Sequence, residues 1–233
     1  MLRTLLLHLN SVLNKKMNEE ISKSMLKSHT SIVGLVCKDG VIVAADRRVT
    51  AGSIVMNKDE KKLKVINDKY IIATTGGAAD ALISEKLISA ELRLLELRNK
   101  SRPNVKEAAN LTGMMLYRNI RTPAMIPFIV GLLFAGVNED GVCELYNIEP
   151  AGGVYRVKDY DANFSSGMPY ILGFLERMYK KDLSVKEGIE LAKECIKAST
   201  QRDSASGNGI DVYSITKDGV NQVVSEEILP QYK

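Results

Sequence analysis

Side chains able to do chemistry occur in short groups along the chain rather than in one block. The most suggestive groups stand beside glycines or at the ends of apolar runs, at residues 29–34, 45–50, 75–80 and 201–207. The chain has 2 histidines, His8 and His29, and both lie in the first 29 residues. Chemistry in the rest of the chain must therefore use Ser, Thr, Lys, Asp, Glu, Tyr or a terminal amine.

Three of the candidate residues also have an ordinary structural interpretation. Thr30 opens an apolar run, as threonines at strand starts often do. Asp46 and the two arginines after it are typical of a solvated turn or a surface ion pair. Lys62 lies in a charged run, 58–64, that is typical of a solvated segment. In a strand, Lys62 and Lys64 would share one cationic face.

The two remaining groups stand at the ends of predicted helices. Gly76 and Gly77 precede a helical pattern and form either a tight turn or a set of backbone N–H groups that would bind an anion or oxyanion. They match no G-x-G-x-x-G or Walker loop, so nucleotide binding is not expected. Residues 201–207 are polar, which is typical of a helix end.

Composition excludes several classes of protein. The 233 residues carry a net charge of +4, but five basic and two acidic residues in 1–29 leave only +1 for the rest, which argues against nucleic-acid binding. The 3 cysteines form no C-x-x-C pair, so neither a zinc ribbon nor a disulfide framework is expected. No apolar run approaches the roughly 20 residues that span a membrane. We expect a cytoplasmic protein with no membrane partner.

Turn signals and apolar periodicity predict the fold. Asp-Gly turns between apolar runs predict three β-hairpins, at 31–45, 128–148 and 209–224. Helical patterns and helix-start signals predict four helices, at 80–98, 103–120, 168–179 and 184–200. Two helix pairs cannot both cover one face of a small sheet. We therefore predict an α+β fold, a four-layer α-β-β-α sandwich of two stacked antiparallel sheets, in a single domain over 30–233.

The first 29 residues differ from the rest in their pattern of apolar and polar residues. They form either a disordered extension or a removable pro-segment, and no signal-peptide cleavage site follows their short apolar patch. Met17 and Met25 are alternative starts of the chain.

In order and spacing, these groups together resemble the β-subunit of the 20S proteasome, of archaeal type. The resemblance covers essentially all of residues 30–230. Its most specific blocks are Ala45-Asp46-Arg47-Arg48-Val49-Thr50, Lys61-Lys62, Gly76-Gly77-Ala78-Ala79-Asp80 and Gln201-Arg202-Asp203-Ser204-Ala205-Ser206-Gly207. It implies the N-terminal-nucleophile hydrolase fold, which has the four layers predicted above.

The resemblance implies a threonine endopeptidase that degrades unfolded proteins to peptides. The nucleophile would be the side-chain oxygen of Thr30, freed as a new N-terminus by removal of residues 1–29. Its own α-amine would be the general base, since a free α-amine has a pKa of roughly 7.7–8.0. Further roles carried over by the resemblance are those of Asp46 and Lys62 beside the nucleophile, Gly76 as oxyanion donor, and Ser166, Asp203 and Ser206 around the amine.

Substrate would lie extended, as an added strand, against the backbone near Thr50, Gly76 and Ala78. Side chains at the specificity-pocket positions include Val49, Thr74 and Ala78, a small and mostly apolar lining. We expect cleavage after apolar residues, with Glu60 and Lys64 at the edge of the pocket.

The sequence departs from the family pattern at His29. Active family members have Gly before the nucleophilic Thr, and a residue with Cβ restricts the backbone that self-cleavage requires. Three interpretations follow: a self-processing enzyme, an enzyme processed by a neighbouring subunit, or a structural subunit whose Thr30 stays capped. A different amidohydrolase of the N-terminal-nucleophile class, often with Cys or Ser as nucleophile, is a further alternative.

The resemblance also implies partners. Seven β-subunits would form a ring, two such rings would stack between rings of α-subunits, and an ATPase ring would feed unfolded protein through the α-ring. No metal or organic cofactor is implied for the chemistry.

Overall fold

A computed structural model describes residues 30–124 and 127–228. Within these residues, two five-stranded antiparallel sheets and one two-stranded hairpin form. The first sheet has the order β10 (Tyr160–Asp161), β1 (Ile32–Cys37), β2 (Gly40–Asp46), β11 (Gly209–Thr216) and β12 (Gly219–Glu227). The second has the order β5 (Leu63–Ile66), β6 (Tyr70–Gly76), β7 (Val130–Val137), β8 (Cys143–Ile148) and β9 (Val154–Val157). The hairpin pairs β3 (Val49–Ala51) with β4 (Ile54–Asn57).

The helices of the described region fall in two pairs, as predicted. They are α2 (Ala78–Asn99), α3 (Val105–Arg121), α4 (Met168–Met178) and α5 (Val185–Thr200). Asn104 starts α3 and Ser184 starts α5, each through a capping box with the Glu three residues later. Local sequence therefore sets where these two helices begin.

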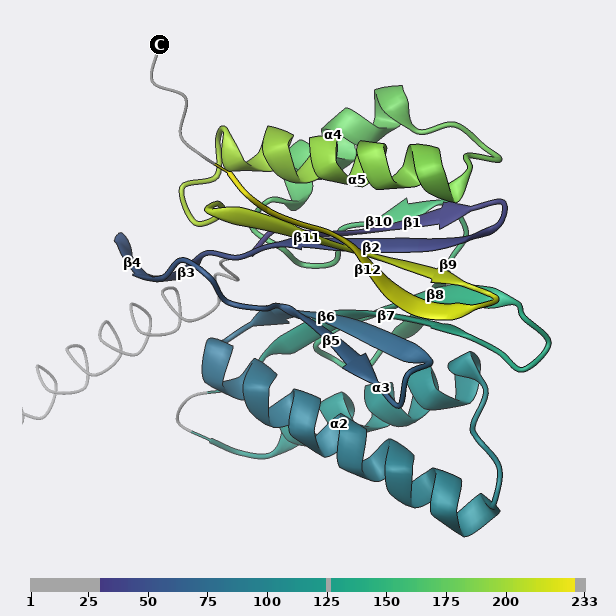
Figure 1. The fold of residues 1–233 in the computed structure, drawn as a ribbon. Coiled ribbons are helices and arrows are strands. Elements are labelled where there is room, and N and C mark those ends of the chain that lie inside the picture. The colour runs from purple at the N-terminus through teal and green to yellow at the C-terminus, as the bar shows by residue number, and fades with distance from the viewer. Residues whose placement is uncertain (1–29, 125–126, 229–233) are drawn as a thin grey trace, which may run out of the picture.

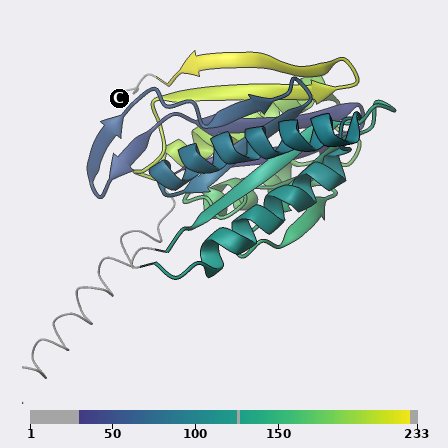
Figure 2. The same cartoon turned by 90° about the horizontal axis from the view of Figure 1, so that it is seen from below.

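Helices and sheets stack in the predicted order. In Figure 1, α4 and α5 cover the outer face of the first sheet, and α2 and α3 cover the outer face of the second. Figure 2 shows α2 and α3 running side by side beneath that sheet. Three apolar layers fill the spaces, one between each helix pair and its sheet and one between the two sheets. The four-layer α-β-β-α sandwich is thus confirmed.

Strand β2 illustrates how alternation builds these layers. Ile42 and Ala44 point toward α4 and α5, whereas Val41, Val43 and Ala45 pack between the sheets. All seven residues of β2 are buried because the strand is central in its sheet and covered on both faces.

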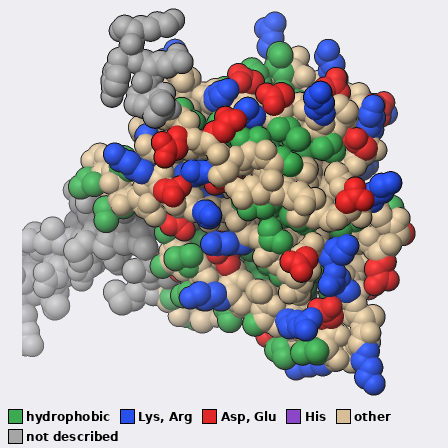
Figure 3. All heavy atoms as spheres, viewed as in Figure 1, with side chains coloured by type: hydrophobic (Ala, Val, Ile, Leu, Met, Phe, Trp, Pro, Cys, Tyr) green, Lys and Arg blue, Asp and Glu red, His purple; other side chains and the backbone are tan. Residues whose placement is uncertain are grey.

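Helix α2 differs from the sequence-based expectation. Its predicted apolar face is broad, but the chain buries only Ser84, Ile88 and Leu92 in full, a narrow stripe at a spacing of four residues. Several other apolar side chains of α2 are between 43% and 60% exposed: Leu82, Ile83, Leu87, Leu94 and Leu97. Figure 3 shows apolar side chains between charged ones over the lower part of the molecule, where α2 lies.

The three predicted hairpins are present as β1–β2, β7–β8 and β11–β12. The hairpin β3–β4 and the short strands β9 and β10 were not predicted. In the part of the chain that is described, no helix combines the length and apolar character needed to cross a bilayer.

Candidate active site

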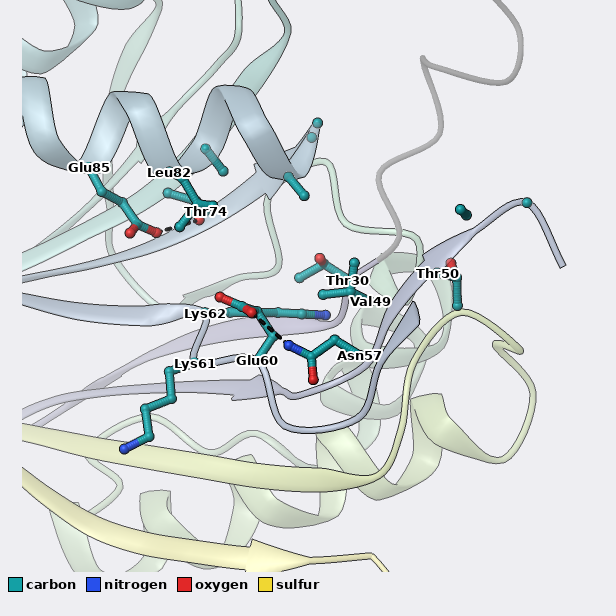
Figure 4. Close-up of a pocket in the computed structure, with 16 residues that line it drawn as sticks. Thr30, Val49, Thr50, Asn57, Glu60, Lys61, Lys62, Thr74, Leu82 and Glu85 are labelled. Atoms are coloured by element: carbon teal, nitrogen blue, oxygen red, sulfur yellow. Dashed lines mark hydrogen bonds between the residues drawn. The ribbon is translucent and has the colours of Figure 1, made fainter. Parts of the chain in front are cut away.

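A pocket of about 420 Å³ opens where the end of β6, the start of α2 and the hairpin β3–β4 meet. Thr30 lies on its wall and is 6% exposed. Lys62 and Gly76 line it too, and Figure 4 shows the Lys62 side chain extending toward Thr30. All four residues predicted to contact substrate are in the lining: Val49, Thr50, Thr74 and Ala78.

Beside Thr30, a buried carboxylate holds a buried ammonium group. Asp46 ends β2, and its Oδ1 accepts hydrogen bonds from Lys62 Nζ at 2.7 Å and from the Ser31 N–H at 2.8 Å. Its Oδ2 accepts from the N–H groups of Gly207 at 2.9 Å and Arg48 at 3.0 Å. The Asp46 side chain is 0% exposed. All these contacts fix Asp46 in one position, so the carboxylate fixes Lys62 in turn.

Burial governs the electrostatics of this pair. Desolvation lowers the pKa of the Lys62 ammonium group from its ordinary value, and the Asp46 carboxylate opposes that shift by attraction and by its hydrogen bond. The structure contradicts two sequence-based interpretations: Asp46 is not part of a solvated turn, and Lys62 is itself buried although Lys58, Asp59 and Lys61 of the same run are exposed. Lys62 lies one residue before β5, so it does not form a cationic strand face with Lys64 either.

The backbone nitrogen of Thr30 has a second set of partners. It donates to Ser166 Oγ at 3.0 Å, and Ser166 Oγ in turn donates to Asp203 Oδ2 at 2.7 Å. Ser206 Oγ donates to the same carboxylate oxygen at 2.6 Å. The chain folds back so that residues 136 positions apart meet at Thr30. The polar segment after α5 is therefore both a helix end, as one interpretation held, and part of the site.

Gly76 occupies a backbone conformation that suits only glycine. Its φ is +110°, and a Cβ there would lie 2.1 Å from the carbonyl oxygen of Ile129. It ends β6, and Gly77 is the N-cap of α2, so the pocket opens at the positive end of a 22-residue helix. This end of the helix favours negative charge in the pocket.

A deeply placed ion pair anchors the end of β2. The Arg47 guanidinium donates through Nη2 to Asp211 Oδ1 at 2.7 Å and through Nε to Asp211 Oδ2 at 2.9 Å. Its Nη2 also donates to Ser225 Oγ on β12 at 2.6 Å. These bonds raise the pKa of Arg47 further above its ordinary value. They tie the residue that follows Asp46 to β11 and β12.

Two acidic side chains line the pocket, and the sequence analysis named only one of them, Glu60. Glu85 of α2 lines the pocket and accepts a hydrogen bond from Thr74 Oγ1 at 3.3 Å, as Figure 4 shows. Burial raises the pKa of the Glu85 carboxyl, with Lys64 opposing. Glu60 also lines the pocket and accepts from Asn57 Nδ2 at 2.9 Å. Glu60 thus lies where expected, whereas Lys64 is not among the residues that line the pocket.

The sequence analysis missed residues whose partners are distant in the chain. Ser31 and Ser199, both 0% exposed, join the group around Asp203, and Glu85 joins the pocket. No helical spacing in the sequence signals Ser199, since α5 ends at Thr200 and Asp203 and Ser206 lie beyond it. His29, predicted to affect processing, lies outside the described residues, and the catalytic roles of the gathered side chains remain predictions.

Comparison with known proteins gives a consistent result. The sequence profile of the family described as "Proteasome subunit" matches residues 26–215. A "Proteasome subunit beta" of Archaeoglobus profundus is 39% identical over 209 residues, covering 90% of this chain and 94% of that protein. The protein of the same name from Ferroglobus placidus is 39% identical over 199 residues, covering 85% and 92%. That of Nanoarchaeum equitans is 37% identical over 199 residues, covering 84% and 98%.

Proposed function

The chain belongs to the proteasome subunit family, as a β-subunit of the 20S core, and we propose that it is a threonine endopeptidase with Thr30 as nucleophile. One observation carries the proposal. Thr30 stands at a pocket with a buried Lys62–Asp46 pair on one side and Ser166 bonded to its backbone nitrogen on the other. A nucleophile, a fixed cation and a held nitrogen are the parts that the chemistry needs.

Removal of residues 1–29 would create the catalytic base. In the intact chain the nitrogen of Thr30 is a peptide nitrogen and takes up no proton. After cleavage the same atom becomes an α-amine, whose ordinary pKa of roughly 7.7–8.0 suits proton transfer near neutral pH. The contact between this nitrogen and Ser166 then orients the amine.

The reaction follows from this arrangement. The Thr30 hydroxyl attacks the substrate carbonyl carbon while the α-amine accepts its proton, and the Lys62 cation favours the developing alkoxide. The Gly76 N–H, at the positive end of α2, donates to the tetrahedral oxyanion; loss of such a donor typically costs about 2.7–4 kcal/mol. The ammonium returns the proton to the leaving amine. Water activated by the amine then hydrolyses the ester on Thr30.

The cysteines support threonine rather than cysteine as the nucleophile. Burial raises the pKa of Cys37 and Cys195 to about 12 and that of Cys143 to about 11. At neutral pH these groups are protonated thiols and poor nucleophiles. This argues against the cysteine-dependent type of amidohydrolase.

Substrate would bind extended between β3 and residues 76–78. Thr50 Oγ1 is buried beside the pocket and has no hydrogen-bond partner among the described residues, which suits a segment that receives an added strand. Val49, Ala78 and Leu82 give the pocket apolar walls, so we expect cleavage after apolar residues.

The same family membership supports an assembly. We propose that this subunit forms seven-membered β-rings, stacked with α-subunit rings, and degrades unfolded proteins in the cytoplasm with an ATPase ring feeding the α-ring. The exposed apolar side chains of α2 suit contact with another subunit.

The decisive experiment is an intact-mass measurement on assembled particles. The subunit would be co-expressed with its α-subunit, with and without a second β-subunit from the same organism. A chain that begins at Thr30, together with hydrolysis of an apolar-residue peptide that Thr30→Ala abolishes, is the expected result. Removal of 1–29 only with the second β-subunit would mean processing in trans. Retention of 1–29 in both cases would instead favour a structural subunit, with His29 as the obstacle.

A further inference from the structure

Three buried serines form a connected group beneath the proposed nucleophile. Ser31 Oγ lies 2.7 Å from Ser206 Oγ and is also hydrogen-bonded to Ser199 Oγ. Ser31 and Ser199 are 0% exposed and Ser206 is 1% exposed. Neither Ser31 nor Ser199 is in the lining of the pocket, so neither would touch a bound peptide.

The direction of these hydrogen bonds follows from the bond that Ser206 donates to Asp203. Ser206 Oγ donates to Asp203 Oδ2 at 2.6 Å, so its single hydroxyl hydrogen is used there. Ser206 must therefore accept from Ser31, and Ser31 in turn must accept from Ser199. The hydroxyls form a one-way donor chain from Ser199 through Ser31 and Ser206 to Asp203.

The donor chain of hydroxyls completes a ring of hydrogen bonds around Thr30. On one side, Asp203 accepts from Ser166, which accepts from the Thr30 nitrogen. On the other side, the donor chain reaches Ser31, the residue covalently attached to Thr30, whose own N–H donates to Asp46. Ser31 therefore links the carboxylate that would hold the amine to the carboxylate that holds Lys62.

The donor chain depends on close packing against Gly167. A Cβ on Gly167 would lie 1.9 Å from Ser31 Oγ and 2.3 Å from Ser199 Oγ, so the glycine next to Ser166 is required for this close approach. The Ser199 carbonyl also accepts one backbone hydrogen bond from the Asp203 N–H, at 2.9 Å. The end of α5 thus fixes both the first donor of the chain and the carboxylate that terminates it.

We propose that Ser31 and Ser199 are positioning residues that act through Ser206 to orient Asp203, and with it the Thr30 amine, for catalysis. This inference rests on the proposed peptidase function. Hydrogen bonds in a chain strengthen one another, so loss of the Ser31 hydroxyl weakens the hold of Ser206 on Asp203. Loss of Ser199 weakens it less, because Ser31 can still donate to Ser206.

The test compares alanine variants in assembled, processed particles. We expect kcat for peptide hydrolysis to fall about 10-fold in Ser31→Ala and about 3-fold in Ser199→Ala, with KM unchanged since neither residue lines the pocket. The control is Ser84→Ala on α2, which removes an equally buried hydroxyl that has no hydrogen-bond partner in the described region; its kcat should stay at the wild-type value.

A double mutant separates a donor chain from independent packing effects. Once the Ser31 hydroxyl is absent, Ser199 has no route to Ser206, so Ser31→Ala/Ser199→Ala should lose no more kcat than Ser31→Ala alone. Multiplying losses, or a rise in KM with kcat unchanged, would overturn the inference. If Ser31→Ala fails to assemble, Ser199→Ala against Ser84→Ala decides the question, and equal activities would overturn it. Wild-type particles without hydrolysis would refute the peptidase function itself, whereas active wild type with unaffected variants would refute the donor chain alone.

Discussion

Replacing Asp46 by Asn tests the central electrostatic argument of the site. The carboxylate is fully buried, accepts four hydrogen bonds and pairs with Lys62, whose side chain is 6% exposed. The Asn side chain keeps the shape of Asp46 but loses its charge. Both oxygens of Asp46 accept from N–H donors, so the NH2 group of the amide would face hydrogen-bond donors in either orientation. Removing one partner of a buried ion pair typically costs about 3–5 kcal/mol, because the other charge stays buried and uncompensated.

That free energy is large enough to measure by urea unfolding of the purified full-length subunit. A loss of about 3–5 kcal/mol corresponds to roughly 10²- to 10⁴-fold in the unfolding equilibrium constant. With a urea slope of about 3 kcal/mol/M, the midpoint should fall by about 1–2 M. Asp59→Asn is the matched control: it breaks a 3.0 Å ion pair with Arg47 whose carboxylate side chain is 72% exposed. Its cost should stay below about 1 kcal/mol.

The pH dependence gives a second, independent readout. Folding lowers the pKa of Lys62. At a pH between the folded and unfolded pKa of this group, the unfolded chain binds more protons than the folded chain. The free energy of unfolding therefore rises with pH in that interval. Asp46→Asn removes the carboxylate that opposes this lowering, which extends the interval to lower pH. Below the ordinary lysine pKa of about 10.4, the unfolding free energy of the variant should therefore rise with pH over a wider interval than that of the wild type. Equal losses in Asp46→Asn and Asp59→Asn, or parallel pH curves, would refute the reasoning.

Three further changes have definite expected outcomes. His29→Gly should speed removal of residues 1–29, since glycine frees the backbone before Thr30; the rate is followed by intact mass, and an unchanged rate would remove His29 as the obstacle. Burial raises the pKa of the Glu85 carboxyl, so the free energy of unfolding falls as pH rises from the unfolded toward the folded pKa of this group. Glu85→Gln removes that loss and should therefore raise the unfolding free energy more at pH 8 than at pH 5. A larger gain at pH 5 would contradict this. Leu87→Gln, on the exposed apolar face of α2, should reduce assembly in native mass spectra while the neighbouring Lys86→Gln does not, and equal assembly of both would separate this face from subunit contacts.

The sequence by itself determined the four helices of the described region, three of its hairpins and the order of these elements. Asp-Gly turns between apolar runs define the hairpins, and the capping box at Ser184 defines the start of α5, because both depend on residues within a few positions of one another. The order of strands and helix pairs then left the four-layer sandwich as the arrangement that gives each helix pair a sheet to pack against. The blocks around Asp46 and Asp203 were also visible as family features.

Tertiary structure alone decided what those residues touch. The same Asp-Arg-Arg turn would be solvated at the edge of a sheet, but β2 is central and covered on both faces, so Asp46 is buried with Lys62. Ser31 meets Ser199 and Ser206 across 168 and 175 positions of the chain, and no local periodicity encodes such a contact. Burial and long-range hydrogen bonds depend on which elements pack together, and this is why the electrostatics of the site and the donor chain to Asp203 required the folded molecule.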